Sequence, residues 1–160
     1  MNFTITRQNL HSGLAAVSAS IPSKTTLPVL SNILFEAKED GVWMSGTDLD
    51  VAVRVKVPAD VKEAGSLTAP GKKLVEITRE LPDQPVEVAT RNEQIELKCG
   101  RSHFKLNGLP AEEFPTLPEV DFSEGWTVTG KDVNGLIHRT AFAVSTEESR
   151  PILNGVLWEL

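Results

Sequence analysis

The sequence predicts an α+β domain made of two β-α-β-β-β halves, with two helices packed on one face of antiparallel sheets. Two segments carry apolar residues at helical spacing, residues 7–21 and 72–81, and a proline follows each of them directly, Pro22 or Pro82. One short β-like run precedes each helix and three such runs follow it. The same order of elements occurs twice, which indicates two similar halves.

The first half begins with residues 1–6, which alternate and are rich in residues that favour strands. A helix over residues 7–21 follows, because its apolar residues recur at spacings of four, three and four and so share one face. These residues are Leu10, Leu14, Val17 and Ile21. Three strands are then predicted, at residues 33–37, 42–45 and 51–57.

The second half repeats this order after a connection at residues 58–64. We predict a short strand at residues 66–69 and then a helix at residues 72–81. The apolar face of this helix consists of Leu74, Ile77 and Leu81. Three more strands complete the half, at residues 86–90, 95–99 and 102–106.

The sequence predicts a second domain after residues 109–125, whose prolines, acidic residues and lack of periodicity are typical of a linker. Residues 126–159 repeat the pattern of residues 3–36 without a gap, 123 positions later, so a strand, a helix and another strand are expected there. We therefore expect a complete first domain at 1–122 and the truncated beginning of a second at 123–160, so that the chain is a fragment.

Composition and charge narrow the classes of function. The chain has 160 residues, of which 40% are hydrophobic, as in ordinary globular proteins. Its net charge of -6 argues against a domain that binds nucleic acid tightly over its whole surface. A basic face on one part of the surface remains an alternative. Neither a signal peptide nor an apolar run long enough to span a membrane is present, so we expect a cytoplasmic protein.

Residues suited to catalysis are few. Asp48 and Asp50 flank one leucine, and one alternative function is a small hydrolase that uses them as metal ligands or as acid and base. Acidic residues between strands are, however, usually solvated turn residues. Cys99 is expected to be a small buried residue, and nothing near it in sequence predicts activation by His103. No cofactor or metal motif is recognised. The tryptophans Trp43, Trp126 and Trp158 are assigned to packing.

Basic residues gather on the predicted helical units of this acidic chain. Those on or beside the helices are Arg7, Lys72, Lys73, Arg79, Lys131 and Arg139, and those in the segments after the helices are Lys24 and Arg150. Acidic residues lie in the same segments, so ordinary solvated helix faces remain an alternative to a functional basic face. These acidic residues are Glu76, Glu80, Asp132, Glu147 and Glu148.

Several short sequence motifs, in the same order along the chain, resemble the N-terminal part of the bacterial DNA polymerase III beta subunit family, the sliding clamps. They are Phe3-Thr-Ile, Thr26-Leu-Pro-Val-Leu-Ser-Asn-Ile-Leu, Gly46-Thr-Asp-Leu, Cys99-Gly-Arg-Ser-His-Phe-Lys-Leu, Leu109-Pro-Ala-Glu-Glu-Phe-Pro and Arg150-Pro-Ile-Leu-Asn-Gly-Val. The resemblance extends over essentially all 160 residues.

The resemblance implies the DNA clamp fold and a non-catalytic function. It implies a ring-shaped homodimer of head-to-tail subunits with three similar domains each, in which the sheets form the outer wall and the helices line a hole for duplex DNA. Such a ring holds the replicative polymerase on its template, independently of DNA sequence, and a clamp loader opens and closes it. A binding module of the same fold without DNA remains an alternative.

The resemblance also implies roles for particular residues. Lys24 matches a DNA-facing basic position of the family, and Arg150 matches the equivalent region of the second domain. Lys72 or Lys73 is expected to serve likewise, and Arg7, Arg79 and Arg139 are assigned to the same surface from their helix positions. Phe104, Leu106, Ile77 and Lys73 match the subunit interface, with plain core packing as the alternative for Phe104. Leu153 resembles part of a partner-peptide pocket whose other residues would follow Leu160, and Glu147 stands where the family is expected to have a polar amide.

Overall fold

The computed structural model describes residues 1–121, 123, 125–147 and 149–159, which fall into two units, Met1–Leu117 and Pro118–Leu160. The sequence places a domain boundary near residue 122, and this residue lies outside the described ones, as does Glu148. The assignment of 1–122 and 123–160 as clamp domains therefore stays a prediction.

The first unit contains every helix and strand that the sequence predicts up to residue 106. Its strands are β1 (Asn2–Thr6), β2 (Asn32–Lys38), β3 (Gly41–Thr47), β4 (Ala52–Val57), β5 (Asp60–Glu63), β6 (Gly65–Pro70), β7 (Pro85–Arg91), β8 (Gln94–Cys99) and β9 (Ser102–Asn107). Its helices are α1 (Arg7–Ser18) and α2 (Gly71–Glu80), with 3-10 helices η1 (Pro28–Ser31) and η2 (Ala111–Glu113).

Strand β5 was not predicted, because the sequence suggests only a connection at residues 58–64. It has a single apolar residue, Val61, which lies opposite Phe3 of β1. Its other residues are charged, as is common in edge strands, where charges discourage pairing with other molecules. An edge strand of this kind lacks the alternation from which strands are recognised.

The two halves exchange their first strands. β1 belongs to the first half but pairs with β7 of the second, which gives the antiparallel sheet β5-β1-β7-β8-β9. β6 belongs to the second half but pairs with β2 of the first, which gives the antiparallel sheet β4-β3-β2-β6. Each half therefore contributes to both sheets, and the sheets adjoin where β6 contacts β8 and β9.

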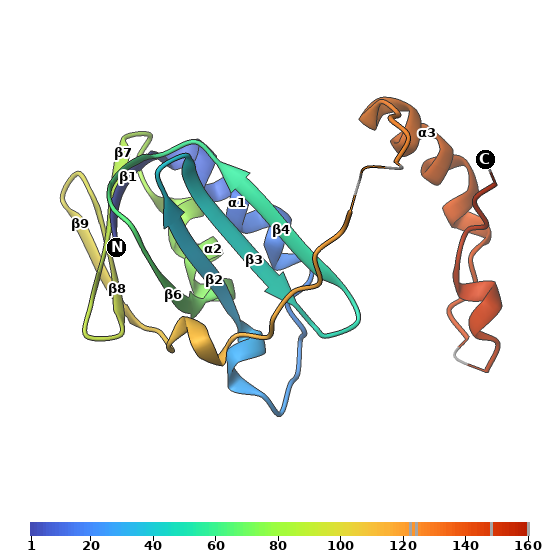
Figure 1. Ribbon diagram of the computed structural model, residues 1–160, viewed down its shortest axis with the longest axis horizontal. Helices are drawn as coiled ribbons and strands as arrows, with labels where there is room; N and C mark the ends of the chain where they lie inside the picture. Colours follow the sequence, from blue (N-terminus) through green and yellow to red (C-terminus); the bar gives the residue numbers. More distant parts are fainter. Residues whose placement is uncertain (122, 124, 148, 160) are drawn as a thin grey trace. The chain divides into compact units, whose positions relative to one another are not determined.

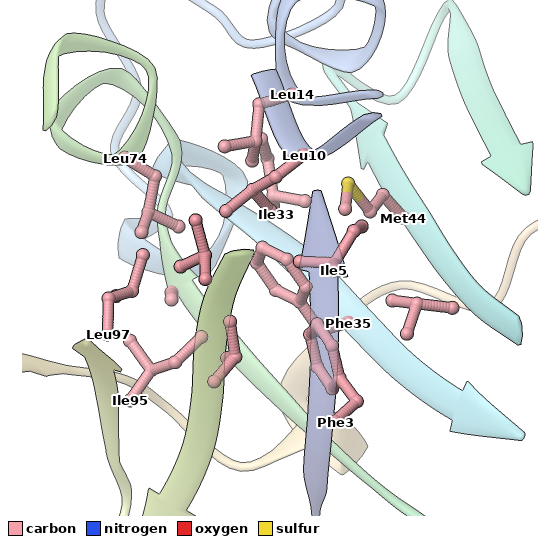
Figure 2. Packing of buried hydrophobic residues seen from close by; sticks show 14 of the residues in the cluster. Phe3, Ile5, Leu10, Leu14, Ile33, Phe35, Met44, Leu74, Ile95 and Leu97 are labelled. Atoms are coloured by element: carbon pink, nitrogen blue, oxygen red, sulfur yellow. The ribbon is translucent and has the colours of Figure 1, made fainter. Parts of the chain in front are cut away.

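One hydrophobic core joins both sheets and both helices. Figure 2 shows Phe3 and Ile5 of β1 among side chains from α1, α2 and the strands of both sheets. Helix α1 contacts β2, β3 and β4, while α2 contacts β2 and β6, and the helices contact each other. Figure 1 shows α1 and α2 together on one side of β2, β3 and β4. This confirms the predicted α+β fold with two helices on one face.

The second unit repeats local features of the first at the predicted interval. Thr6 caps α1 by accepting a hydrogen bond from the backbone N–H of Asn9, and Thr129 accepts the same bond from Asp132 at the start of α3 (Gly130–Thr140). The 3-10 helices η1 and η4 (Pro151–Asn154) likewise begin at equivalent prolines. A third short helix, η3 (Ala141–Ala143), follows α3.

The two strands expected in the second unit are absent from its described residues, so this part of the prediction is wrong. Residues 126–129 and 156–159 form neither strand nor helix. In the first unit, β1 is held by hydrogen bonds to β5 and β7, whereas no strand of the described residues pairs with residues 126–129 or 156–159. Trp126 and Trp158, assigned to packing, are about half exposed for the same reason.

No helix in the described part of the chain is long and apolar enough to cross a membrane.

The shared core predicts a large cost for truncating an α1 side chain. Leu14 is fully buried, so we expect Leu14→Ala to lower the free energy of unfolding by about 2–5 kcal/mol, measured by urea denaturation. Leu49→Ala removes the same atoms from a side chain that is 60% exposed and should change it by less than about 0.5 kcal/mol. Equal losses in the two variants would contradict the packing described above.

Candidate nucleic-acid interface

Arg7 joins the two helices and does not extend freely into solvent. Its Nε donates to the backbone oxygen of Thr78 at 3.2 Å, and its Nη2 donates to that of Arg79 at 2.7 Å. These carbonyls belong to the last turn of α2, where a positive charge complements the helix dipole. His11 Nδ1 lies 3.2 Å from Thr78 Oγ1 and adds a second link. Arg7 therefore has a structural role that its position in the sequence did not reveal.

Three lysines remain exposed near the helices. Lys72 and Lys73 lie in the first turn of α2, and Lys24 lies in the loop between α1 and η1. Within the described residues, none of the three forms an ion pair at 4.0 Å or less. A positive charge at a helix N-terminus opposes the helix dipole, so Lys72 and Lys73 gain no dipole stabilisation there. These lysines are therefore available to an anionic partner.

Basic residues on the sheets are in a different situation. Lys38 and Arg54 both form ion pairs with Glu36, and Lys56 with Asp40. The hydrogen bond from Lys56 lowers the pKa of the Asp40 carboxyl below its usual value. These pairs neutralise much of the positive charge on this sheet.

The other sheet has one cluster of this kind, in which Lys105 and His103 flank Glu96, while Lys62, Arg91 and Lys98 form no ion pair among the described residues. Lys105 Nζ lies 2.8 Å from the Glu96 carboxylate, and His103 Nε2 lies 3.3 Å from it. The hydrogen bond from Lys105, followed by that from His103, lowers the pKa of Glu96.

Trp43 lies on the first sheet, with the Arg54 guanidinium 4.6 Å from its ring centre, so this tryptophan packs across strands as predicted.

Lys24 borders a groove that the sequence did not predict. The groove has a volume of about 480 Å³ and lies between the loop after α1 and the turn between β3 and β4. Its lining residues are Pro22, Lys24, Thr25, Thr26, Leu27, Leu30, Asp48 and Leu49. Leu49 has a positive φ of 83°, which is uncommon for a leucine and gives no recognisable signal in sequence.

Two of the residues assigned to a subunit interface, Phe104 and Leu106, lie on β9, an edge strand of its sheet. Phe104 and Leu106 lie opposite Leu97 and Ile95 of β8, so they share the face that looks into the core, and both are partly buried. Ile77 of α2 is also partly buried against this core, and Lys73 is exposed. The edge of β9 offers unpaired backbone groups to another strand. An interface role for these residues stays a prediction.

In the second unit, Arg139 of α3 and Arg150 are exposed, and Leu153 of η4 is 48% exposed. The backbone oxygen of Leu153 accepts a hydrogen bond from the N–H of Ser145, which links Ser145 to η4. The exposed Arg79 of the first unit pairs with its neighbour Glu80. The roles assigned to these residues remain predictions.

The catalytic alternatives find no support in the geometry. Asp48 Oδ1 accepts hydrogen bonds from the backbone N–H groups of Asp50 and Val51, at 3.1 and 2.7 Å, as a turn residue does. Cys99 is buried, as predicted, while His103 is exposed and bonded to Glu96. No group of three or more potential metal ligands occurs among the residues that the structure describes.

Comparisons with known proteins agree on one family. A family model described as DNA polymerase III beta subunit, N-terminal domain, matches residues 1–118. The beta sliding clamp of Staphylococcus epidermidis is 36% identical over 168 residues, which cover 99% of this chain and 44% of the relative. That of Bacillus subtilis is 33% identical over 100% of this chain and 45% of the relative.

Solved structures give the same result. The DNA polymerase III subunit beta from Pseudomonas aeruginosa is similar with a TM-score of 0.85 and 37% identity, over 97% of this chain and 43% of that chain. The chain thus spans less than half the length of these relatives.

Because Arg7 links the helices, its loss should destabilise the fold. We expect Arg7→Gln to lower the free energy of unfolding by roughly 1–3 kcal/mol, since two charge-assisted hydrogen bonds are lost. Arg7→Lys should not restore it, because an ammonium lacks the planar fork that reaches both carbonyls. The exposed control Lys72→Gln should change stability by less than about 0.5 kcal/mol in urea denaturation. An Arg7→Gln protein as stable as this control would contradict the structural role of Arg7.

Proposed function

The chain belongs to the DNA polymerase III beta subunit family, and from this premise we propose that it forms part of a sliding clamp that encircles duplex DNA. The observation that carries the proposal is the group of exposed lysines beside the helices, Lys24, Lys72 and Lys73, none of which forms an ion pair among the described residues. On the sheets, Lys38, Arg54, Lys56 and Lys105 are paired, whereas Lys62, Arg91 and Lys98 form no ion pair among the described residues. The three lysines beside the helices supply an affinity for phosphates within an acidic chain, as a ring lined by helices requires.

A weakly basic lining suits a protein that must slide. Tight contacts with bases would have to break at each step along the duplex, whereas long flexible side chains exchange phosphates and bridging water with little barrier. Lys24, Lys72 and Lys73 are such side chains, and Arg150 and Arg139 would contribute likewise from the second unit. Arg7 contributes chiefly to the fold, because two of its donors are occupied.

The proposed ring is a homodimer in the full-length protein, with β9 as one of its joints. An edge strand that presents Phe104 and Leu106 can extend its sheet by pairing with a strand of another subunit. Ile77 and Lys73 of α2 would lie at the same joint, and Leu153 would contribute to a pocket for partner peptides. The polymerase and the clamp loader are the proposed partners, in the cytoplasm, and the protein itself would catalyse no reaction.

Topological holding is the property that tests this function. The full-length protein, loaded on nicked circular DNA by its loader, should stay bound until the circle is cut and should then slide off the ends. The measurement is the amount of protein that elutes with DNA in gel filtration, before and after linearisation. Protein that stays on linear DNA would show a direct grip and would contradict the proposal.

The lysines near the helices should set how efficiently the ring is loaded. We expect Lys24→Glu with Lys72→Glu to reduce the amount loaded at moderate salt by roughly tenfold, because two attractive contacts with phosphates become repulsive. A matched control, Lys62→Glu with Lys98→Glu, makes the same change of charge at exposed positions on β5 and β8 and should load normally. Equal loss in both double variants would count against a DNA-facing helix layer.

A further inference from the structure

The loop that carries Lys24 is held at both ends by buried side chains. At its start, Ile21 packs into the main core. At its end, Val29 and Leu30 of η1 are buried in a second, separate hydrophobic cluster. Between these anchors the loop is exposed, apart from local hydrogen bonds between Thr25 Oγ1 and the backbone of Leu27. The position of Lys24 therefore depends on both anchors.

The second cluster depends on Phe114, a residue of the segment that the sequence suggested was only a linker. Phe114 is 7% exposed and packs with Val29 and Leu30, while Leu34, Leu109 and Leu117 surround them. We call residues 108–117 the strap. Figure 1 shows its gold part, around η2, beside the blue segment of η1. Without the Phe114 ring, Val29 and Leu30 would lose the largest side chain that covers them.

The strap is fastened to the edge of β6 rather than lying loosely on the surface. The backbones of Leu109 and Thr68 exchange two hydrogen bonds, of 3.0 and 3.3 Å, and the Thr68 hydroxyl donates to the Leu109 oxygen at 2.9 Å. Asn32 Nδ2 donates to the same hydroxyl, at 2.9 Å. Gly108 approaches so closely that a Cβ at this position would lie 2.1 Å from the Thr68 oxygen. These hydrogen bonds to β6 thus hold the strap in a position where Phe114 packs against η1.

We propose that Phe114 is a positioning residue for Lys24, which acts by fixing the η1 end of the lysine's loop. The inference rests on the proposed function, because the position of Lys24 matters for DNA only if Lys24 meets DNA. The strap is also the last part of the first unit, and the chain continues from it into the second. The connection between the units is therefore bonded to the same anchor that holds the DNA-facing loop.

The first experiment measures amide hydrogen exchange in this 160-residue chain. Phe114→Leu should raise the exchange rates of the Leu27 and Leu30 amides about tenfold or more, because local opening of the loop becomes easier, and should leave the amides of β3 and β4 unchanged. Phe3→Leu is the matched control, since it makes the same substitution at a buried residue of the main core. Phe3→Leu should not raise the exchange rates of Leu27 and Leu30 selectively.

Gly108→Ala tests the strap without touching Phe114. Its added methyl group clashes with the Thr68 oxygen, so it should displace the strap and reproduce the loop signature of Phe114→Leu. Unchanged exchange at Leu27 and Leu30 in both strap variants would overturn the inference, whatever the function of the protein.

The second experiment is a double-mutant cycle on DNA loading in the full-length protein. Phe114→Leu should reduce loading by roughly two- to fivefold when Lys24 is present and have no effect in a Lys24→Ala background, because a positioning residue acts through the group that it positions. If the double variant loads less DNA by the product of the two single-variant reductions, the inference is overturned, since Phe114 then acts independently of Lys24. If Lys24→Ala alone loads normally, the proposed contact of Lys24 with DNA fails, while the exchange data still decide whether the strap holds the loop.

Discussion

Burial of α1 and α2 in one core shared by both sheets is the constraint on which the other features depend. Because Leu10, Leu14 and Leu74 point into that core, the opposite faces of the two helices are turned outward together. The link from Arg7 to the end of α2 then fixes the helices against each other. The packing of the two helices is therefore sufficient to give them a common outward surface.

The distribution of charge on this scaffold is a second consequence of its geometry. Antiparallel strands place basic and acidic side chains side by side at fixed spacing, so part of the charge on the sheets is neutralised there, as it is where Lys105 of β9 lies opposite Glu96 of β8. Lys72 and Lys73 lie at the end of a helix where no acidic residue occupies the first turn. An acidic protein can thus keep a local attraction for phosphate without a net positive charge.

Local pattern was sufficient to predict α1, α2 and every strand of the first unit except β5, but not how these elements combine. The spacing of Leu10, Leu14 and Val17 identifies α1, whereas strand exchange between the halves depends on pairing between distant segments and leaves no local signal. Exposure of Lys24 and Lys72 agrees with their assignment to a binding face, although their role remains predicted. The contacts of Arg7 with α2 and of Phe114 with η1 were not predicted, because a helix position or a proline-rich context does not reveal what a side chain contacts.

Strand exchange also determines the order in which the chain can fold. β1 is the first strand to leave the ribosome, yet its partners β5 and β7 begin at Asp60 and Pro85. Until β7 has been synthesised, Phe3 and Ile5 have no complete sheet or core in which to bury themselves. Such pairing across long sequence separations slows folding and leaves apolar strands exposed in the meantime. During synthesis, the sheet that contains β1 therefore cannot be completed until the second half of the unit has been made.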